Sequence, residues 1–348
     1  MESLDIEVVS TVGAALLTSA MLTGVARRLA LSRGVLDVPN DRSSHEVPTP
    51  RGGGVAIVLT TTAAWLALVL LGKLRTDLFI ALSGGGIAVA IVGLLDDRHR
   101  VSAGARLAVH LGAAIWALAW LGGLPPMQFG DRLVSLGWAG YALGVVGIVW
   151  VLNLFNFMDG IDGIAASEAV FISWSGVPLA LIAGLAGNDS GVSAAAIVLG
   201  AACFGFLLWN WPPAKIFMGD VGSGYLGYVI AVLALATTRE SPVALLVWLI
   251  LGGVFFVDAT VTFVRRLARH ERVYEAHRSH AYQWLARRWQ SHRRVTILVV
   301  FVNVIWLLPC AYLAAVYPAF AVWIAVGGLA PVAVLAIAAG SGRTERVD

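Results

Sequence analysis

Residues 135–165 read SLGWAGYALGVVGIVWVLNLFNFMDGIDGIA. The stretch starts as an apolar run of the length that a helix needs to cross a bilayer, which is about 20 residues. It ends with two amides and two carboxylates at intervals of three residues, namely Asn153, Asn156, Asp159 and Asp162. Polar groups of this kind are costly beside lipid, and by default they mark a functional site. The stretch therefore predicts a membrane-spanning helix with a ligand site at its end.

The same apolar pattern recurs along the whole chain. Of the 348 residues, 59% are hydrophobic and 13% are charged, which is about half the charged share of a soluble protein. Many windows are apolar on every side, whereas the helices of a soluble protein keep a polar face. We therefore predict an all-α polytopic membrane protein with about 10–11 transmembrane helices, folded as one domain over residues 1–348. The candidate spans are 7–26, 53–72, 78–95, 105–123, 135–155, 164–185, 192–209, 222–238, 242–264, 295–316 and 318–340.

Positive charge is distributed unevenly between the two sides of these spans. If the chain crosses the membrane at each span, 20 of the 24 Lys and Arg residues fall on the odd-numbered connections or in the C-terminal tail. Cytoplasmic loops of membrane proteins carry the excess of Lys and Arg. The odd-numbered connections and the C-terminus are therefore predicted to be cytoplasmic, and the N-terminus to be outside. The exceptions are Lys73, Arg75, Arg132 and Arg239.

Five polar motifs fall on the predicted cytoplasmic side, although only Lys and Arg set the topology. They are PNDRSSHEVPTPRGGG (39–54), GLLDDR (93–98), NLFNFMDGIDG (153–163), KIFMGDVGSG (215–224) and HRSHAYQ (277–283). Motifs far apart in the sequence thus converge on one face of the membrane, and this is where the active site is predicted.

Carboxylates dominate three of these motifs. Asp96 and Asp97 are adjacent, and adjacent carboxylates repel each other unless a cation intervenes. In KIFMGDVGSG, the glycines around Asp220 allow the backbone to approach an anion closely. Carboxylate and amide oxygens suit Mg²⁺, which keeps substrate phosphates as its other ligands. These residues and those of 153–163 are therefore candidates for binding a metal ion or handling a phosphate.

The late motif HRSHAYQ supplies cationic and imidazole groups. His277, Arg278 and His280 are suited to clamp a pyrophosphate or to stabilise a leaving phosphate. Oxygen ligands for Mg²⁺ together with cationic groups for anions describe a phosphoryl-transfer site. The surrounding spans indicate that one substrate is a lipid. A zinc hydrolase is disfavoured because the sequence lacks the His and Cys spacing of zinc ligands.

Each motif also has a purely structural interpretation. The aspartate pair can anchor a loop through Arg98 or Arg100, and asparagines can hydrogen-bond between helices. The basic residues after the ninth span can hold anionic lipid headgroups. Asp258 can support the site or pair with Arg265, about two turns further on. Four histidines are assigned to the surface or to packing: His99, His110, His270 and His292.

Taken in order, LLDDR, NLFNFMDGIDGIA, MGDVGSGYLG and HRSHAYQ resemble the motifs of the polyprenyl-phosphate N-acetylhexosamine-1-phosphate transferases. The resemblance runs from about residue 36 to residue 288. It implies an enzyme of the bacterial plasma membrane that transfers a sugar-1-phosphate from a UDP-sugar to undecaprenyl phosphate and releases UMP, with Mg²⁺ or Mn²⁺ as cofactor. It implies no nucleic-acid partner, and it allows a homodimer.

The resemblance also implies a role for each matching residue. Asp220 is the expected principal metal ligand, assisted by Asn156. The expected catalytic residues, the first two at the lipid phosphate and the others at the nucleotide sugar, are Asp96, Asp97, Asp159 and Asp162. The expected substrate-binding residues are Asn153, Arg106, His277, Arg278 and His280.

Two departures narrow the expected branch of the family. Peptidoglycan translocases carry a lysine shortly after the aspartate pair and a run of histidines in the late loop, whereas this chain has DDRHR and HRSHAYQ. This favours an initiator of O-antigen or other envelope polysaccharides over the alternative, a phospho-N-acetylmuramoyl-pentapeptide transferase. The expected sugar is N-acetylglucosamine or a 6-deoxy relative such as N-acetylfucosamine or N-acetylquinovosamine.

Two other classes of membrane protein remain as alternatives. An ion-coupled transporter also buries carboxylates, but it predicts them near mid-bilayer within an inverted repeat. Here they cluster at one face, and the sequence shows no repeat. A CDP-alcohol phosphotransferase requires an arginine and further aspartates after Asp159-Gly160, and IDGIAASEAVF lacks them.

Overall fold

The structure, a computed structural model, describes residues 6–39, 47–99, 101–129, 132–182, 191–241, 243–272 and 277–344. Its α-helices are α1 (Ile6–Ser32), α2 (Gly54–Leu70), α3 (Thr76–Arg98), α4 (Ala103–Leu121), α5 (Gly137–Met158), α6 (Ile164–Ile182), α7 (Val192–Asn210), α8 (Asp220–Glu240), α9 (Ala244–Leu251), α10 (Gly253–Ala268), α11 (Ala281–Trp289), α12 (His292–Val302), α13 (Leu308–Val316) and α14 (Ala321–Ala339). A π-helical turn (Asn303–Leu307) joins α12 to α13, and a 3-10 turn (Pro318–Phe320) precedes α14. Among the basic residues behind the predicted topology, Arg42, Arg100 and Arg346 lie outside the described residues.

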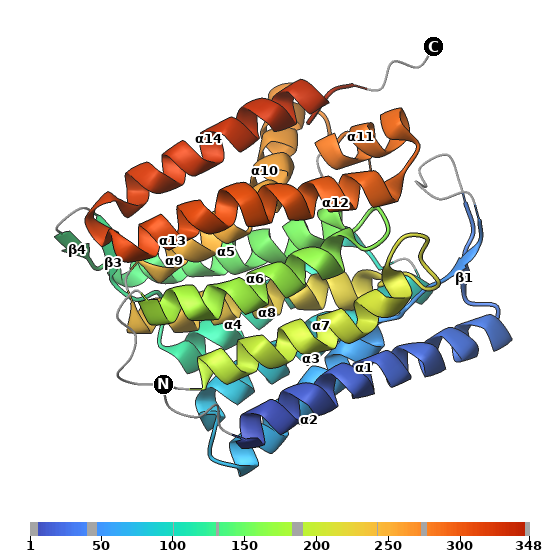
Figure 1. Cartoon of the computed structure of the whole chain (residues 1–348), viewed down its shortest axis with the longest axis horizontal. Coiled ribbons are helices and arrows are strands. Elements are labelled where there is room, and N and C mark those ends of the chain that lie inside the picture. The colour runs from blue at the N-terminus through green and yellow to red at the C-terminus, as the bar shows by residue number, and fades with distance from the viewer. Residues whose placement is uncertain are drawn as a thin grey trace.

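Most of the helices run side by side in one bundle (Figure 1). Within the described ranges, eight helical segments are long and apolar enough to cross a membrane, and the bent pair α9–α10 makes a ninth. These nine correspond to nine of the eleven predicted spans. The other two predicted spans, 53–72 and 164–185, correspond to α2 and α6, which pack against α7. The predicted all-α polytopic membrane fold is confirmed.

Helix α8 forms the centre of the bundle. Its residues 221–238 are all buried, and α3 and α5 pack against this helix. Glycines on α3 allow this approach, since a Cβ at Gly85 would collide with Tyr228 and one at Gly86 would crowd Tyr225. Close packing over small residues is a main source of helix association in lipid. Because α8 is surrounded by protein, its N-terminus can present polar groups away from lipid.

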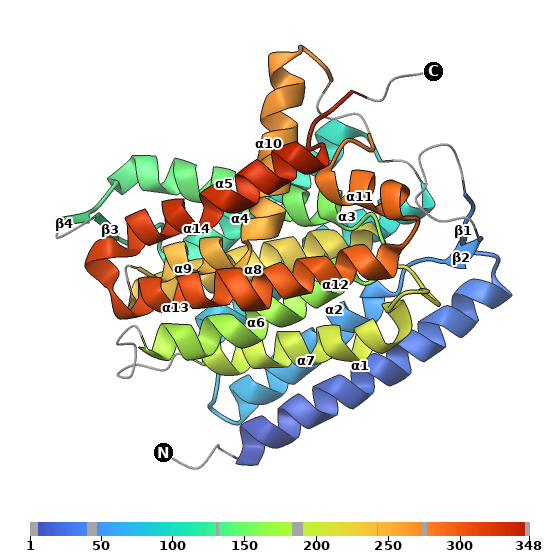
Figure 2. The ribbon, with the colours of Figure 1, turned by 45° about the horizontal axis from the view of Figure 1, so that its top comes forward.

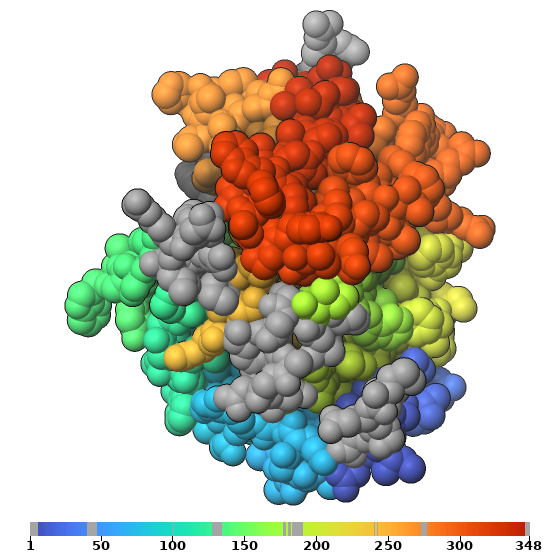
Figure 3. Space-filling view, turned by 60° about the vertical axis from the view of Figure 1, so that its left-hand side comes forward, coloured from blue at the N-terminus to red at the C-terminus, as the bar shows by residue number. Residues whose placement is uncertain are grey.

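The outer helices have the opposite character. Helices α1 and α14 lie on opposite sides of the molecule, as the blue and red residues show in the space-filling view (Figure 3). Both leave large apolar side chains exposed, among them Leu17 and Met21 on α1 and Trp323 and Leu335 on α14. An exposed apolar surface of this extent is what lipid tails cover in a membrane protein.

The predicted span 242–264 is not one straight helix, and this corrects the prediction. Helix α9 ends at Leu251, α10 starts at Gly253, and the two axes differ by 77°. Adjacent glycines at the break carry no side chains to resist the bend. Helix α10 consequently stands away from the bundle axis (Figure 2). The connection between the predicted spans 242–264 and 295–316 is also partly helical, because α10 extends to Ala268 and α11 lies within this connection.

Two short hairpins mark the opposite ends of the bundle. Strands β1 (Leu36–Asp37) and β2 (Thr49–Pro50) pair antiparallel near α11 and the C-terminal end of α14, while β3 (Met127–Phe129) and β4 (Arg132–Val134) pair at the other end (Figure 1). The N–H of Phe217 donates to the carbonyl of Pro50 at 2.8 Å, and the N–H groups of Gly53 and Gly54 donate to the carbonyls of Phe217 and Met218.

This pairing has a direct consequence for the site. Residues 50–54 run alongside residues 217–218, immediately before α8 begins. The side chain of Arg51 is therefore delivered to the N-terminus of α8, although the two lie far apart in the sequence.

Candidate active site

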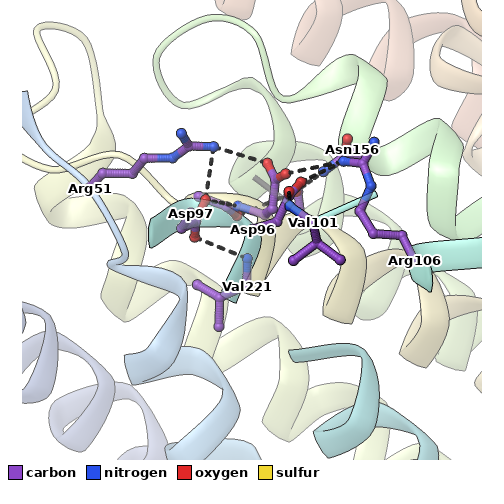
Figure 4. Close-up of polar contacts among 10 residues, drawn as sticks. Arg51, Asp96, Asp97, Val101, Arg106, Asn156 and Val221 are labelled. Carbon is purple, nitrogen blue, oxygen red and sulfur yellow. Dashed lines mark hydrogen bonds and ion pairs between the residues drawn. The ribbon is translucent and has the colours of Figure 1, made fainter. Parts of the chain in front are cut away.

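Four of the sequence motifs meet where α3 and α5 end and α8 begins. Asp96 and Asp97 lie in the last turn of α3, Asn153 and Asn156 in the last turns of α5, and Asp220 is the first residue of α8. Figure 4 shows the side chains of Asp96, Asp97, Arg51, Arg106 and Asn156 gathered in this small region. The predicted convergence of these motifs at one end of the bundle is what the structure shows.

Asp97 anchors the start of α8. Its Oδ1 accepts a hydrogen bond from the N–H of Asp220 at 2.9 Å, and its Oδ2 accepts one from Val221 at 3.3 Å. A carboxylate at a helix N-terminus satisfies unpaired N–H groups and matches the helix dipole. Gly219 has φ +78°, and a Cβ there would collide with the Asp97 carboxylate, so only glycine permits this cap. With 4% of its side chain exposed, Asp97 is a structural anchor more than a free ligand.

Arg51 bridges two of the carboxylates. Its Nη2 lies 2.8 Å from Asp97 Oδ1 and 3.1 Å from Asp220 Oδ1. Burial opposes the charge on the guanidinium, but Asp97 and Asp220 raise the pKa of Arg51 above its usual value, so it is a permanent cation here. No role for Arg51 is predicted from the sequence, although PTPRGGG is predicted to lie on the same membrane face. Its position became evident only from the backbone pairing of residues 50–54 with 217–218.

Asp96 has a different set of partners. Its Oδ2 accepts a hydrogen bond from Arg106 Nη1 at 2.5 Å, and its Oδ1 accepts one from the N–H of Val101 at 2.7 Å. Arg106 Nη1 also lies 3.9 Å from Asp220 Oδ2. The two adjacent aspartates are therefore neutralised by different arginines, Arg106 and Arg51. Arg98, one of the two partners in the loop-anchor interpretation, forms neither ion pair, and the other, Arg100, lies outside the described residues.

A first cavity of about 330 Å³ opens beside this cluster between α3, α4, α5 and α8. Its polar lining residues are Arg106, Asp220, Asn153, Asn156 and His110, and the rest of the lining is apolar or glycine. Asn156 donates its Nδ2–H to Ser223 Oγ at 3.1 Å. The side-chain oxygen of Asn156 is therefore the atom that can bind a cation. Asn153 donates to the carbonyl of Val149 in its own helix. The cavity therefore combines an anion-binding and cation-binding end with apolar walls.

A second, larger cavity of about 760 Å³ contains Asp162. Asp162 Oδ2 accepts a hydrogen bond from the N–H of Ala214 at 3.0 Å, and Oδ1 lies 3.2 Å from His292 Nδ1. The aromatic side chain of Phe217 and the basic side chains of Arg287 and Arg293 also line this cavity. The structure thus separates Asp162 from the Asp220 cluster. It also places His292 beside Asp162, whereas the sequence alone assigns His292 to the surface or to packing.

Asp159 lies between these two regions, at the C-cap of α5. Burial raises the pKa of the Asp159 carboxyl well above its usual value; Asp220 raises it further, and Arg51 opposes the rise. Asp97 and Asp162 also act on it electrostatically. Helix α5 ends at Met158, and Gly163 has φ +74°, so the chain turns here. Of the two aspartates at this turn, Asp162 lines the second cavity, and Asp159 lines neither of the two.

The histidine motif packs against this turn. The rings of His277 and His280 stack with centroids 4.9 Å apart, and those of His280 and Tyr282 stack at 5.7 Å. Tyr282 donates its hydroxyl to the carbonyl of Phe157 at 2.9 Å. His280 is 2% exposed, whereas His277 and Arg278 are half-buried. Of the two predicted histidines, His277 is accordingly the one accessible to a substrate.

The donor set suits a hard divalent cation when substrate phosphate is present. Within the described ranges, no three His, Cys, Asp or Glu side chains are arranged to hold a metal by themselves. Mg²⁺, however, typically takes one or two protein carboxylates together with substrate phosphates and water. Asp220 and Asn156 line the same cavity and supply such oxygen atoms. Four carboxylates (Asp96, Asp97, Asp159 and Asp220) outnumber the two arginines, so the region attracts cations.

Comparison with known proteins identifies the family of the chain. Residues 79–238, which include the aspartate pair, the asparagine motif and Asp220, match the model of glycosyl transferase family 4. A Bacillus subtilis (strain 168) protein described as "Probable undecaprenyl-phosphate N-acetylglucosaminyl 1-phosphate transferase" is 30% identical over 292 residues, covering 82% of this chain and 79% of that protein. The decaprenyl-phosphate N-acetylglucosaminephosphotransferase of Mycobacterium tuberculosis (strain ATCC 25618 / H37Rv) is 30% identical over 327 residues, covering 81% and 78%.

A third relative belongs to the alternative branch. The phospho-N-acetylmuramoyl-pentapeptide-transferase of Moorella thermoacetica (strain ATCC 39073 / JCM 9320) is 29% identical over 224 residues, covering 60% of this chain and 66% of that protein. The chain belongs to glycosyl transferase family 4, in the group of polyprenyl-phosphate N-acetylhexosamine-1-phosphate transferases. It is therefore a multi-pass membrane phosphotransferase.

Proposed function

We propose that this enzyme transfers an N-acetylhexosamine-1-phosphate from a UDP-sugar to undecaprenyl phosphate at the cytoplasmic face, releasing UMP and starting a lipid-linked envelope polysaccharide such as O-antigen. The observation that carries the proposal is the first cavity. Asp220, Asn156 and Arg106 lie at its polar end, and its other walls are apolar. A ligand with a phosphate and a hydrocarbon tail likewise has one polar end and one apolar part, so it matches this cavity.

Each cavity accounts for one substrate. The apolar cavity with Arg106 suits the polyprenyl phosphate, because a guanidinium pairs strongly with phosphate. The larger cavity, with Phe217 for stacking and with Arg287, His292 and Arg293 as donors, suits the nucleotide of the UDP-sugar. Asp159 lies between them, where the sugar-bearing phosphorus must meet the acceptor phosphate. The sugar phosphate would thus be transferred across the turn at residues 158–163.

A divalent cation belongs to the same proposal, with Asp220 and Asn156 as its protein ligands. When bound, Mg²⁺ or Mn²⁺ would polarise the diphosphate and neutralise the charge that develops on the departing UMP. His277 and Arg278 would donate to the diphosphate, and Asp96, held by Arg106, would orient the acceptor phosphate or accept its proton. Asp97 would keep the N-terminus of α8, and with it Asp220, in place.

The direct test uses membranes that contain the enzyme, undecaprenyl phosphate and a panel of radiolabelled UDP-sugars: UDP-GlcNAc, UDP-FucNAc, UDP-QuiNAc and UDP-MurNAc-pentapeptide. We expect a lipid-linked product and one equivalent of UMP from one of the first three donors. EDTA should abolish the product, and excess Mg²⁺ or Mn²⁺ should restore it, because the proposed ion takes few protein ligands and an added chelator competes with them. Product from the pentapeptide donor alone would reassign the branch, and no product from any donor would contradict the proposal.

The choice among donors rests on two sets of observations. The two relatives named for N-acetylglucosaminyl transfer match over 82% and 81% of this chain, whereas the pentapeptide transferase of Moorella thermoacetica matches over 60% of it. The motifs DDRHR and HRSHAYQ also depart from the translocase pattern. Both favour an N-acetylhexosamine over a muramoyl pentapeptide. The 6-deoxy sugars, the outside position of the N-terminus and the homodimer stay predictions from the sequence.

Replacing Arg106 should affect one substrate selectively. We expect Arg106→Ala to raise the KM for undecaprenyl phosphate at least about 10-fold, as loss of a charge-assisted hydrogen bond would, and to leave the KM for the UDP-sugar within about 2-fold. Initial rates measured at varied concentrations of each substrate give both values. Arg239→Ala, at the far end of α8, is the matched control and should change neither. An equal rise in both KM values would remove Arg106 from the acceptor cavity.

A further inference from the structure

The histidine loop, residues 277–283, is hydrogen-bonded to two elements that lie outside the site. One is α10, which carries Asp258, and the other is the turn after α14, which carries Ser341 and Gly342. Neither element belongs to the two cavities described above. Their contacts with the loop are nevertheless specific, and they involve polar atoms that are buried.

Asp258 has four hydrogen-bond donors around its carboxylate. The N–H groups of Ala281 and Tyr282, at the start of α11, donate to Oδ1 at 2.8 Å and to Oδ2 at 3.2 Å. The hydroxyls of Ser341 and Thr262 donate to Oδ1 at 2.7 Å and 3.3 Å. Asp258 is 3% exposed, and a buried carboxylate is stable only when its oxygens are satisfied in this way. Of its two possible roles, Asp258 therefore supports the loop and does not pair with Arg265.

The turn after α14 completes the support. Ser341 is 0% exposed, and the N–H of Gly342 donates to the carbonyl of Ser279 at 2.6 Å. Arg265 Nη1 donates to the carbonyl of Ser341 at 2.7 Å. Gly340 and Gly342 have φ values of +113° and +67°, which glycine adopts without strain. These two glycines let the chain turn back onto the loop directly after the last helix.

Tyr282 connects this support to the reacting region. Its N–H is held by Asp258, and its hydroxyl donates to the carbonyl of Phe157. The same hydroxyl occupies the space that a Cβ at Gly160 would need. Phe157 and Gly160 flank Asp159, so a movement of Tyr282 would displace the turn between the two cavities.

We propose that Asp258 and Ser341 are positioning residues that hold the histidine loop against the Asp159 turn, through the N-terminus of α11 and Tyr282. The expected effect on kcat rests on the proposed function. The expected support of the loop by Asp258 and Ser341 does not. The C-terminal turn is then part of the working enzyme, although it lies outside the segment that matches the family model.

Ser341→Ala is the first test, because it removes one hydroxyl and no charge. We expect kcat to fall about 10-fold, within the range known for residues that orient ligands from behind, with both KM values within about 2-fold. Ser83→Ala is the matched control. Ser83 is a buried serine in α3 whose hydroxyl has no hydrogen-bond partner among the described residues, and its replacement should leave kcat unchanged.

Asp258→Asn is the stronger variant, because an amide nitrogen would face an N–H donor. We expect kcat to fall about 10–100-fold. Hydrogen exchange measured by mass spectrometry on the substrate-free protein should be faster at Ala281 and Tyr282 in both variants than in the wild type and in Ser83→Ala. This measurement needs no activity, so it tests the support even if the proposed reaction is wrong.

The outcomes separate cleanly. Faster exchange in the loop together with a lower kcat supports the proposal. Unchanged exchange in Ser341→Ala and Asp258→Asn overturns the support itself. If the wild-type enzyme is active and the two variants show faster exchange with an unchanged kcat, the positioning role is overturned.

Discussion

Asp220→Asn should lower the rate of lipid-linked product formation at least about 1,000-fold, which corresponds to about 4 kcal/mol of transition-state stabilisation. Among the carboxylates of the cluster, Asp220 is both accessible to a ligand and located in the lining of the first cavity. Its side chain is 26% exposed, against 4% for Asp97, and it lines the first cavity together with Asn156. An amide of the same shape keeps one oxygen but loses the charge that a hard divalent cation requires.

The measurement for Asp220→Asn combines turnover, metal binding and folding. Product formation in membranes gives the rate, and electron paramagnetic resonance of Mn²⁺ with UDP-sugar present reports metal binding, which should weaken. Asp77→Asn is the matched control, because Asp77 lies at the opposite end of α3 and pairs with Arg75 on the surface. Both variants should reach the membrane at wild-type amounts. Full activity of Asp220→Asn would remove Asp220 from the metal site.

Much of the fold could be predicted because its determinants are local. The length and hydropathy of each run indicate a span. The orientation that the Lys and Arg count indicates stays a prediction. The bend between α9 and α10 could not be predicted in this way, because residues 242–264 are as apolar as a straight span. What stabilises the bend is tertiary: Gly253 packs against Leu307 and Leu329, from helices more than 50 residues further along the chain.

The composition of the site was predictable for a similar reason, and its internal division was not. Costly polar groups beside lipid identify Asp96, Asp97 and Asp220 without any structure. Their separate roles depend on partners distant in sequence: Asp97 caps α8, whereas Asp96 binds Arg106. The role of Arg51 at the site could not be predicted either, because the positive-inside rule already accounts for an arginine in a basic connection.

Arg51 therefore gives the second large prediction. Arg51→Ala should lower turnover at least about 100-fold, the loss typical of removing one preorganised donor from an active site. The guanidinium contacts Asp97 and Asp220 from a single nitrogen, at 2.8 Å and 3.1 Å. Without it, two carboxylates face each other at the start of α8 with no cation between them, and they repel. Asp220 would keep its charge beside the cavity but lose the donor that holds its Oδ1.

Two further variants distinguish orientation from charge. Arg51→Lys keeps the charge but replaces a planar fork by a point charge, so we expect it to recover part of the activity, within about 10-fold of wild type. Arg33→Ala, an exposed arginine in the same connection, should have no effect. Mn²⁺ binding provides the decisive comparison. Arg51→Ala makes the cluster more negative, so Mn²⁺ affinity should hold or rise while turnover falls, the opposite of the coupled loss in Asp220→Asn. Wild-type turnover in Arg51→Ala would instead assign the two ion pairs to folding alone.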